Sequence, residues 1–384
     1  MDFQFVTAGR VIFGDGALAQ AGALAAEFGQ HALVVTGSTP SRAAPLIQQL
    51  QSADINATSF SVGKEPTLEL VRRGADQART AGIDLVIGFG GGSVIDAAKA
   101  IAALVTNSGD PLDYLEVIGQ GQPLTEDPLP IIAIPTTAGT GAEVAKNAVL
   151  KSTEHQVKVS LRHPKLLPNI ALVDPELTHS VPPAVTAYTG MDALAQVLEP
   201  YVTRFTNPLT DAICTGGLRR AAQSLQRAYE NGSNASARTD IALTSLFGGL
   251  ALTNAKLGAA HGFAGPLGGL IDAPHGAIVA ALLAPVMRAN IDLLREREPD
   301  NPALPRYQQL AAILTDDPTA DAHDGVAWVE ATANALDIRP LSAYGLTRDH
   351  FPTVYEKAKQ SSSMQGNPIT YTEQDMERVL SEAL

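Results

Sequence analysis

The segment IDLVIGFGGGSVIDAAKA, residues 83–100, constrains the fold more strongly than any other part of the sequence. An apolar run of strand length leads into three consecutive glycines, Gly90, Gly91 and Gly92, and a helical pattern begins directly after Ser93. Glycines let a backbone approach a ligand closely, and the unpaired N–H groups at a helix N-terminus favour an anion. The segment therefore predicts a buried strand, a tight turn and a helix that receives a group such as a pyrophosphate.

Strand and helix patterns alternate through the whole first half of the chain. Because this spacing is typical of βαβ units, the half is expected to form a parallel sheet with helices on both faces. Strands are predicted at 3–7, 10–13, 31–37, 57–62, 84–90 and 129–137, and helices from 17 to 28, from 38 to 50, at 67–82 and at 93–106.

The pattern changes after VDPELTHSVPP, residues 173–183, where strand-like alternation stops. Apolar residues then recur at helical intervals. A chain of 384 residues is long for one core, so two domains are expected. We predict an α/β domain at 1–181 and an all-helical domain at 182–384. Helices are predicted at 184–199, 208–229, 237–256, 276–294, 305–314, 322–336, 348–359 and 373–382.

Composition narrows the range of partners. The net charge of −13 disfavours a nucleic acid or an anionic membrane surface as a partner. Cys214 is the only cysteine, which excludes an internal disulfide and a thiolate metal cluster and fits a reducing, cytoplasmic compartment. We see no signal peptide in MDFQFVTAGR and no apolar run near the roughly 20 residues that span a bilayer.

A second glycine-rich turn, IPTTAGTGAEVAK at 134–146, also follows an apolar strand. Its hydroxyl groups come from Thr136, Thr137 and Thr140. Alone, it would be read as a loop with helix caps. Two such turns after neighbouring parallel strands, however, place two polar loops at the carboxyl edge of one sheet, where open α/β sheets bind ligands.

Two motifs in the second half carry candidate metal ligands. In TGMDALAQVLEP, Asp192 and Gln196 lie four residues apart and share one face of a helix. His261 and His275 stand at the two ends of a glycine-rich, almost uncharged segment, which we interpret as a loop. A lone histidine is more often a core residue than a ligand, but two histidines with an inward carboxylate suit Fe²⁺ and also Zn²⁺. The other histidines are interpreted as surface or structural: His31, His155, His163, His179, His323 and His350.

Taken together, the motifs resemble those of the iron-containing (group III) alcohol dehydrogenases, in the dehydroquinate synthase-like superfamily. The resemblance runs in order and with the family spacing from near residue 10 to the C-terminus. It is carried by GGGSVIDAAK, IPTTAGTGAEV, VDPELTHSVPP, TGMDALAQVLEP and HGFAGPLGGLIDAPHGAIVAALLAPV.

The resemblance implies a dinucleotide-binding α/β domain, an all-α metal-binding domain and a homodimer. It implies hydride transfer between a nicotinamide cofactor and a small alcohol or aldehyde, with Asp192, His261 and His275 holding the metal that acts as Lewis acid. The family pattern places cofactor contacts at Gly91, Gly92, Ser93, Asp96, Thr136, Thr137, Thr140, Lys158 and Leu177.

The residues that follow the predicted strand at 31–37 indicate the choice between NAD and NADP. An acidic residue there usually accepts the ribose 2′-OH of NAD and repels the 2′-phosphate of NADP. This chain instead has Gly37 and Ser38, with Arg42 close behind. The sequence therefore favours NADP(H) over NAD(H). The alternative interpretation is that Thr39 or Ser41 only caps the next helix.

Two positions depart from the family pattern. Gln196 stands where the family has a histidine ligand, so its oxygen either completes the shell or only hydrogen-bonds a water, leaving three ligands as in the zinc-dependent glycerol dehydrogenases. Gly265 stands where many members have a histidine credited with proton relay. Its absence removes an acid/base group and widens the pocket, which predicts a larger substrate than a two- or three-carbon alcohol.

Several other functions remain as alternatives. A maleylacetate reductase-like enzyme without metal would fit the missing histidines, and a zinc polyol dehydrogenase would fit three ligands. A dehydroquinate synthase-like lyase is disfavoured because few basic residues surround the metal motifs. A nucleotide-binding regulator on an inactive scaffold is disfavoured by His261 and His275.

Overall fold

The computed structural model describes residues 2–63, 65–155 and 157–384. The chain divides into two compact units. The α/β unit comprises Val6–Thr137 and Gly141–His179, and the helical unit comprises Ala138–Thr140 and Ser180–Leu384 with the described residues up to Phe5. The domain ranges 1–181 and 182–384 stay a prediction.

The α/β unit is built on a six-stranded sheet in which every neighbouring pair of strands is parallel. A parallel sheet buries both faces, and its strands here are short runs of Val, Ile, Leu and Ala. In spatial order the strands are β1 (Arg10–Phe13), β8 (Ile170–Val173), β5 (Ile131–Pro135), β4 (Leu85–Gly90), β2 (His31–Thr36) and β3 (Asn56–Ser61).

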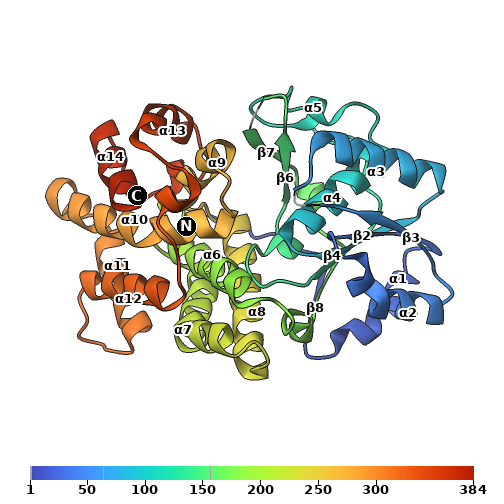
Figure 1. Ribbon diagram of the computed structural model, residues 1–384, viewed down its shortest axis with the longest axis horizontal. Coiled ribbons are helices and arrows are strands. Elements are labelled where there is room, and N and C mark those ends of the chain that lie inside the picture. Colours follow the sequence, from blue (N-terminus) through green and yellow to red (C-terminus); the bar gives the residue numbers. More distant parts are fainter. Residues whose placement is uncertain (1, 64, 156) are drawn as a thin grey trace. The chain divides into compact units, whose positions relative to one another are not determined.

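Helices cover both faces of this sheet, as predicted. On one face, α3 (Leu68–Thr80) and α4 (Gly92–Thr106) pack through apolar side chains such as Val71 and Ile101. On the other face, α1 (Ala21–Ala25) and α2 (Ala44–Ser52) bury Leu24, Leu46 and Leu50 (Figure 1). The α/β class with a parallel sheet is therefore confirmed.

Some predicted local elements are wrong. Residues 3–7 are not a strand, because within the described chain they pair with no other strand. The helix predicted from 17 to 28 is a 3₁₀ turn at Ala17–Gln20 followed by the short α1. The sequence reading also missed the short β8, the four-residue α5 (Pro111–Tyr114) and the antiparallel hairpin of β6 (Asn147–Ser152) and β7 (Val157–Arg162), which packs beside α4.

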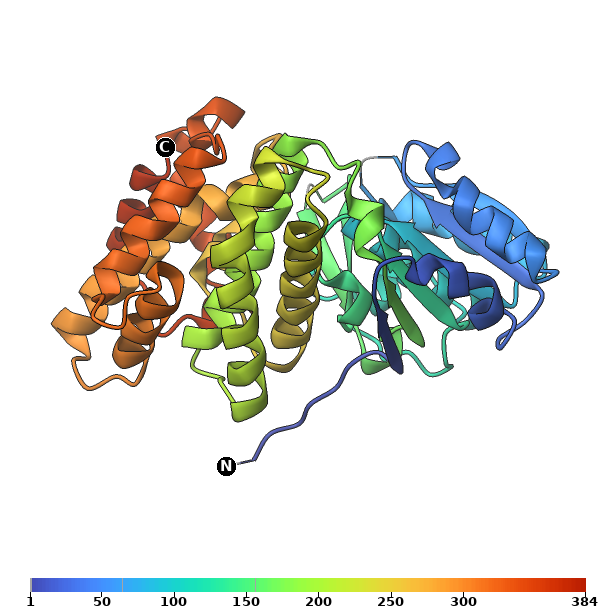
Figure 2. The ribbon, with the colours of Figure 1, turned by 90° about the horizontal axis from the view of Figure 1, so that it is seen from below.

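The second unit is helical throughout, which confirms the predicted all-α class. Pro183 begins its central helix, where a missing N–H costs little. Helices α6, α7 and α8 pack side by side (Figure 2). The helices are α6 (Pro183–Val202), α7 (Pro208–Glu230), α8 (Ala235–Asn254), α9 (Ala259–Leu270), α10 (His275–Arg297), α11 (Ala303–Thr315), α12 (Ala322–Ala335), α13 (Phe351–Ala358) and α14 (Glu373–Glu382).

Helix α9 corrects the prediction of a glycine-rich loop between the two histidines. Its sequence, AAHGFAGPLGGL, contains four glycines in addition to Pro266 and would be a poor isolated helix. Packing overrides that preference, because His261 and Phe263 are buried and a Cβ on Gly262 would lie 3.0 Å from the Met364 side chain. The small residues thus let this helix approach its neighbour closely.

Helix α10 is long and apolar enough to cross a membrane by length and composition alone. This differs from the sequence reading, which found no such run. Of its most apolar window, 83% is buried inside the protein. The helix therefore has the burial typical of the core helix of a folded domain.

Candidate functional site

Helix α6 presents three polar side chains to the interior of the helical unit. Asp192, Gln196 and Glu199 are spaced by four and three residues, so they lie on one side of the helix. They are 2%, 3% and 3% exposed, respectively. Polar groups are seldom buried this deeply without partners or a ligand, so the three residues mark a candidate site.

Asp192, His261 and His275 form a compact group of potential metal ligands. One ligand atom from each of the three lies within 4.8 Å of those of the other two. The Nε2 atoms of His261 and His275 are 3.3 and 3.9 Å from Asp192 Oδ1. Their ring centroids lie 5.6 Å apart. The fold therefore brings together residues that are about 70 and 14 positions apart in sequence.

Two atoms of this group are buried without a hydrogen-bond partner among the described residues. They are Asp192 Oδ1 and His261 Nε2, which lie close together but outside hydrogen-bonding geometry. An unsatisfied buried polar atom costs about 1–3 kcal/mol. One divalent cation would satisfy both atoms, and carboxylate oxygen with imidazole nitrogen is a donor set that Fe²⁺ and Zn²⁺ accept. The residues present thus fit a metal ion.

Glu199 is a residue of this site that the sequence reading missed. Its Oε2 accepts a hydrogen bond from His261 Nδ1 at 2.6 Å, and its Oε1 accepts one from the Ala260 N–H at 2.7 Å. Gly258 allows this approach, because a Cβ there would lie 2.8 Å from Oε1. A carboxylate behind a histidine fixes its tautomer and orientation toward a metal. The sequence did contain a signal for Glu199, because it is the third acidic or amide residue on the side of the helix that carries Asp192 and Gln196.

The same carboxylates make the site attractive to positive charge. Burial lowers the pKa of His261, but the nearby carboxylates of Glu199 and Asp192 outweigh burial and raise that pKa to about 10. A buried imidazole between two carboxylates is therefore stabilised by a cation at Nε2. A proton and a metal ion compete for that position.

The predicted cofactor residues gather at the carboxyl edge of the parallel sheet. Gly37 and Ser38 follow β2, Gly91 follows β4, Thr136 follows β5 and Leu177 lies in the turn after β8. These four strands are neighbours in the order β8-β5-β4-β2. The chain leaves β2 toward α2 on one face and β4 toward α4 on the other, and such a change of direction is the point in the topology at which open α/β sheets bind ligands.

The two glycine-rich turns lie directly against each other. The Thr136 N–H donates to the Gly90 carbonyl at 3.0 Å, and a Cβ on Gly91 would lie 3.2 Å from Thr137 Oγ1. Helix α4 starts at Gly92, and within the described chain no side chain caps its N-terminus. Its first N–H groups, beside Ser93, therefore suit a phosphate.

Asp96 and Lys99 lie three residues apart on helix α4. Lys99 is fully buried and donates to the carbonyls of Ala145 and Asn147 at 2.8 and 3.0 Å. Asp96 accepts the Val149 N–H at 3.1 Å, and burial raises its pKa to about 6 despite Lys99. In the structure, both side chains thus anchor the β6 region to α4.

The remaining predicted cofactor residues, Lys158 and Thr140, belong to different units of the chain. Lys158 on β7 forms an ion pair with Glu65. Thr140 lies in the short segment Ala138–Thr140, which belongs to the helical unit. A Cβ on its neighbour Gly139 would lie 2.7 Å from Thr189 Cβ on α6, so only glycine fits there.

Two family models together match most of the chain. The model described as iron-containing alcohol dehydrogenase matches residues 8–175, and the one described as Fe-containing alcohol dehydrogenase family, C-terminal, matches residues 186–384.

The chain belongs to the iron-containing alcohol dehydrogenase family.

Its relatives include a choline dehydrogenase of Bacillus subtilis (strain 168), 33% identical over 362 residues that cover 92% of this chain and 88% of the relative. A solved 1,3-propanediol oxidoreductase is 31% identical, with a TM-score of 0.93 and full coverage of both chains. The structure of a sulfoacetaldehyde reductase from Bifidobacterium kashiwanohense in complex with NAD⁺ is 26% identical, with a TM-score of 0.88, covering 99% of this chain and 98% of that one.

As a member of this family, the chain is an oxidoreductase that acts on CH–OH groups with a nicotinamide cofactor. Its fold is the dehydroquinate synthase-like fold of the family. The buried group on α6, α9 and α10 thus belongs to a chain whose family is named for a metal. The sheet edge belongs to a chain with a structural relative that was solved with bound NAD⁺.

This alcohol dehydrogenase has open space at Gly265 on α9. A Cβ added to Gly265 would meet no described atom within 4 Å. A side chain is therefore tolerated at this position on steric grounds.

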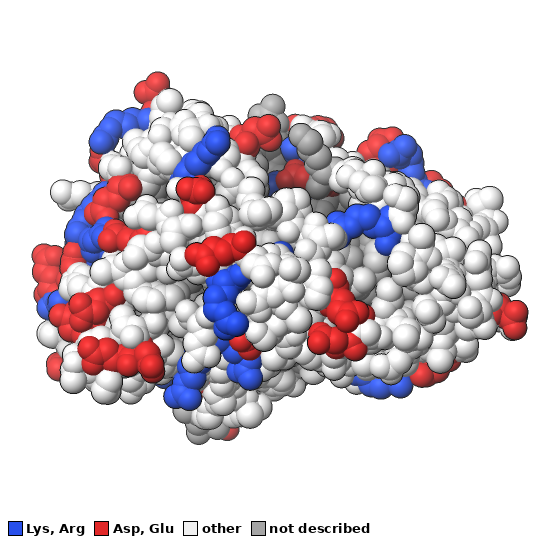
Figure 3. All heavy atoms as spheres, turned by 60° about the horizontal axis from the view of Figure 1, so that its bottom comes forward, with Lys and Arg blue, Asp and Glu red and all other residues white. Residues whose placement is uncertain are grey.

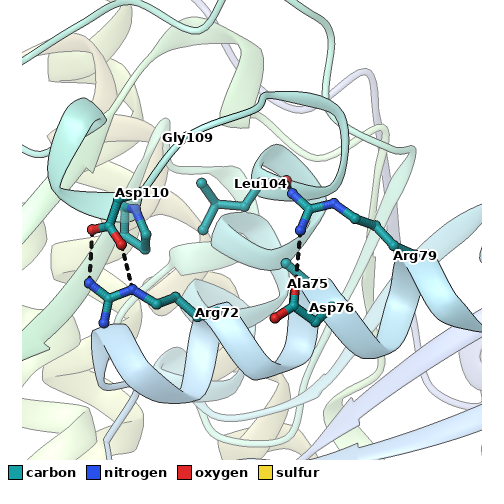
Figure 4. A pocket seen from close by; sticks show the side chains of 8 residues that line it. Arg72, Ala75, Asp76, Arg79, Leu104, Gly109 and Asp110 are labelled. Atoms are coloured by element: carbon teal, nitrogen blue, oxygen red, sulfur yellow. Dashed lines mark hydrogen bonds and ion pairs between the residues drawn. The ribbon is translucent and has the colours of Figure 1, made fainter.

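A surface cavity of about 340 Å³ lies between α3 and the start of α5, and the residues that line it belong to neither candidate site (Figure 4). Two arginines line it, but both are already paired. Arg72 binds Asp110 through two hydrogen bonds of 2.6 and 2.8 Å, and Arg79 binds Asp76 at 2.9 Å. With their charges neutralised in this way, the two guanidinium groups do not form an anion site.

The described residues on the face shown in Figure 3 give no second candidate site by their charge. On the face shown in Figure 3, lysine and arginine side chains lie among aspartates and glutamates and form no continuous basic area. This distribution agrees with the net charge of −13.

Proposed function

We propose that this enzyme interconverts an alcohol and its aldehyde or ketone with NADP(H), at a divalent cation held by Asp192, His261 and His275. One observation carries the proposal: three side chains remote in sequence meet within 4.8 Å, and two of their ligand atoms are buried without a hydrogen-bond partner in the part of the chain that the structure describes. A site prepared for a cation explains both features.

The metal proposed is Fe²⁺, with Zn²⁺ as the alternative. When bound, it supplies Lewis-acid polarisation of the substrate oxygen. The protein holds Asp192 and His261 in nearly complete burial, while His275 has a side chain that is 44% exposed. His275 thus stands on the accessible side of the group. Glu199 keeps the proton on Nδ1 of His261, which leaves Nε2 as a ligand atom.

NADP(H) is proposed as the cofactor, and it supplies or accepts the hydride. Gly91, Gly92 and Ser93 at the start of α4 receive its phosphates, together with Thr136, Thr137 and Thr140 from the second turn. Asp96, Lys158 and Leu177 are proposed as further contacts. The preference over NAD(H) rests on Gly37, after which no carboxylate follows until Asp54. The alternative role for Thr39 loses support, because its side chain makes no capping hydrogen bond.

The substrate proposed is larger than a two- or three-carbon alcohol. The open space around Gly265 supports this size, since a histidine at that position would take up volume. Without that histidine, the proton leaves through water or through the cofactor ribose.

Two analyses of the same fresh protein preparation test the proposal. The first is elemental analysis, with turnover measured before and after chelation and after return of Fe²⁺ or Zn²⁺. The second is a panel of aldehydes and alcohols of increasing size with NADPH and with NADH. We expect one ion per chain, loss of turnover on chelation and recovery with the metal. Full turnover in metal-free protein would reject the metal role and would favour the maleylacetate reductase-like alternative.

A homodimer is proposed as the assembly, formed through the free edge of β1. This strand lies at the end of the sheet order, and Val11 is 40% exposed on it. An unpaired strand edge is a ready surface for a second copy of the chain. Light scattering of the purified protein, compared with a Val11→Lys variant, tests this assembly.

We also propose a reducing, cytoplasmic location. The single cysteine, Cys214, is buried, and burial raises the pKa of its thiol, so it is poorly reactive. Cell fractionation with an antibody to the protein tests this location.

A further inference from the structure

The buried amide of Gln196 stands where the family pattern has a histidine ligand. It lies one turn after Asp192 on α6 and is 3% exposed. Its Nε2 donates two hydrogen bonds, to Asp192 Oδ2 at 3.0 Å and to the Gly139 carbonyl at 3.1 Å. Its Oε1 is buried and has no hydrogen-bond partner among the described residues.

The chemistry of these neighbours fixes which way the amide faces. A carboxylate oxygen and a carbonyl oxygen only accept hydrogen bonds, so the NH₂ group must point at both of them. The opposite orientation of Gln196 would set its oxygen against two other oxygens and leave the NH₂ group without an acceptor. Gln196 Oε1 is therefore the atom turned away from Asp192 Oδ2 and Gly139.

This orientation also assigns the two oxygens of Asp192. Oδ2 is occupied by the Gln196 amide, while Oδ1 is the buried atom without a hydrogen bond and lies 3.3 Å from His261 Nε2. The amide thus holds the carboxylate so that one oxygen faces the ligand group. Asp192 Oδ1, Gln196 Oε1 and His261 Nε2 are thus all buried without a hydrogen-bond partner among the described residues.

We propose that Gln196 is a metal ligand through Oε1, so that this enzyme holds its cation with one carboxylate oxygen, one amide oxygen and two imidazole nitrogens. The same side chain positions Asp192 through its NH₂ group. This inference rests on the proposed metal role of Asp192, His261 and His275, and adds a fourth donor to it. The amide oxygen is a neutral and harder donor than an imidazole nitrogen. The site therefore favours Mn²⁺ and Fe²⁺ relative to Zn²⁺ more than a three-imidazole site would.

The test uses the full-length chain, stripped of metal and titrated separately with Co²⁺, Mn²⁺ and Zn²⁺ against a chromogenic chelator. Gln196→Leu keeps nearly the same volume and removes both the oxygen and the NH₂ group. Gln196→His supplies the imidazole of the family pattern. Gln226→Leu is the matched control, because that glutamine is exposed on α7 and bonds only to Glu230 among the described residues. Thermal unfolding of each stripped variant confirms that it is folded.

The two Gln196 variants are expected to change metal binding in different ways. Gln196→Leu lowers Co²⁺ affinity by about tenfold or more, in the range seen for partners of metal sites. Gln196→His raises Zn²⁺ affinity relative to Mn²⁺ and moves the visible absorption bands of bound Co²⁺ to shorter wavelength, because nitrogen replaces oxygen. Gln226→Leu changes neither quantity.

Two other results would overturn different claims. If the wild-type chain binds Co²⁺ and Gln196→Leu leaves both its affinity and its absorption unchanged, Gln196 is not a ligand and the proposed function stands. If the wild-type chain binds none of the three ions, the proposed metal role itself fails. If Gln196→Leu does not fold, the absence of any band shift in Gln196→His rejects the inference by itself.

Discussion

The sheet edge of the α/β unit and the buried group of the helical unit are built in opposite ways. The proposed cofactor site at the sheet edge consists of backbone N–H groups, glycines and hydroxyls at the ends of four neighbouring strands. The proposed metal site of the helical unit consists of a few side chains on α6, α9 and α10, several of whose atoms are buried without a hydrogen-bond partner among the described residues. A site made by many backbone groups tolerates the loss of one side chain, whereas a site made by three side chains does not.

Among the variants that test this comparison, Asp192→Asn should have the largest effect. In Asp192→Asn, metal affinity should fall by more than about 100-fold, since even outer partners of ligands are worth about 10- to 100-fold. The value of kcat/KM should fall by about 1000-fold or more, because Lewis-acid stabilisation is worth several kcal/mol. Metal titration and steady-state kinetics check both values.

Asp300→Asn provides the control for Asp192→Asn, because Asp300 is exposed after α10. Equal metal affinity in the two variants would contradict the concentration of binding in a few side chains.

The second effect concerns Glu199, which contacts His261 and not the proposed ion. In Glu199→Gln, the amide oxygen must still accept from the Ala260 N–H, so the NH₂ group faces His261 Nδ1. The proton then moves to Nε2, which can no longer bind metal. Metal affinity should fall by about 10- to 100-fold with little change in Tm.

Metal titration of Glu199→Gln beside Glu296→Gln, an exposed control, measures this effect. Nitrogen NMR of His261 reports the tautomer directly. An unchanged Nδ1–H tautomer would show that Glu199 does not hold the proton.

The third prediction tests the proposed cofactor site at the sheet edge, by changing the preference between NADPH and NADH. A Cβ on Gly37 meets only Val94 Cγ2, at 3.9 Å, so Gly37→Asp fits without strain. Its carboxylate should repel a 2′-phosphate and lower kcat/KM for NADPH by about 10- to 100-fold, a repulsion of about 1–3 kcal/mol.

Gly37→Asn, which has the same shape without charge, should retain most of the NADPH activity. Steady-state kinetics of both variants with NADPH and with NADH measure this difference. An unchanged ratio of NADPH to NADH activity in Gly37→Asp would place the 2′-phosphate elsewhere.

A smaller effect is expected at Gly265, where the structure leaves open space. Gly265→His should lower kcat/KM for the bulkier substrates by about tenfold, the usual penalty for lost pocket volume. It should also add a new ionisation to the pH–rate profile, which Gly265→Ala should not do. An unchanged substrate profile and pH–rate curve would show that Gly265 does not determine the size of the substrate.

The smallest effect is expected in the surface cavity of Figure 4. The Arg72–Asp110 pair has side chains 39% and 42% exposed. Arg72→Gln should therefore lower the free energy of unfolding by less than about 1 kcal/mol and leave kcat/KM unchanged. Chemical denaturation and kinetics check this. A large kinetic loss would mean that the cavity takes part in function.

The two regions also differed in how far the sequence revealed them. The strand, glycine turn and helix at 83–100 are local in sequence, so their pattern predicted β4 and α4 nearly to the residue. The strand β8 was missed because it is only four residues long, and α9 because its glycines and proline disfavour a helix. Packing against residues distant in sequence decides both elements.

The helical unit shows the same limit at the level of single residues. Asp192, His261 and His275 were named from their sequence motifs and again from the family resemblance, and the structure brings them together. Glu199 was missed, because an acidic residue at the end of a helical motif looks like a surface position. Only tertiary packing reveals that it is buried behind His261. Likewise, only the contacts of Gln196 with Asp192 and Gly139 fix the direction of its amide oxygen.

The central claim is that one cation sits between Asp192, His261 and His275, and anomalous X-ray diffraction at the iron edge tests it most directly. Crystals of the Fe²⁺-loaded enzyme should give a single strong anomalous peak within about 2.0–2.3 Å of Asp192 Oδ1 and the two Nε2 atoms. Crystals of the Fe²⁺-loaded enzyme with no anomalous density among these three side chains, while the preparation turns over substrate, would contradict the account.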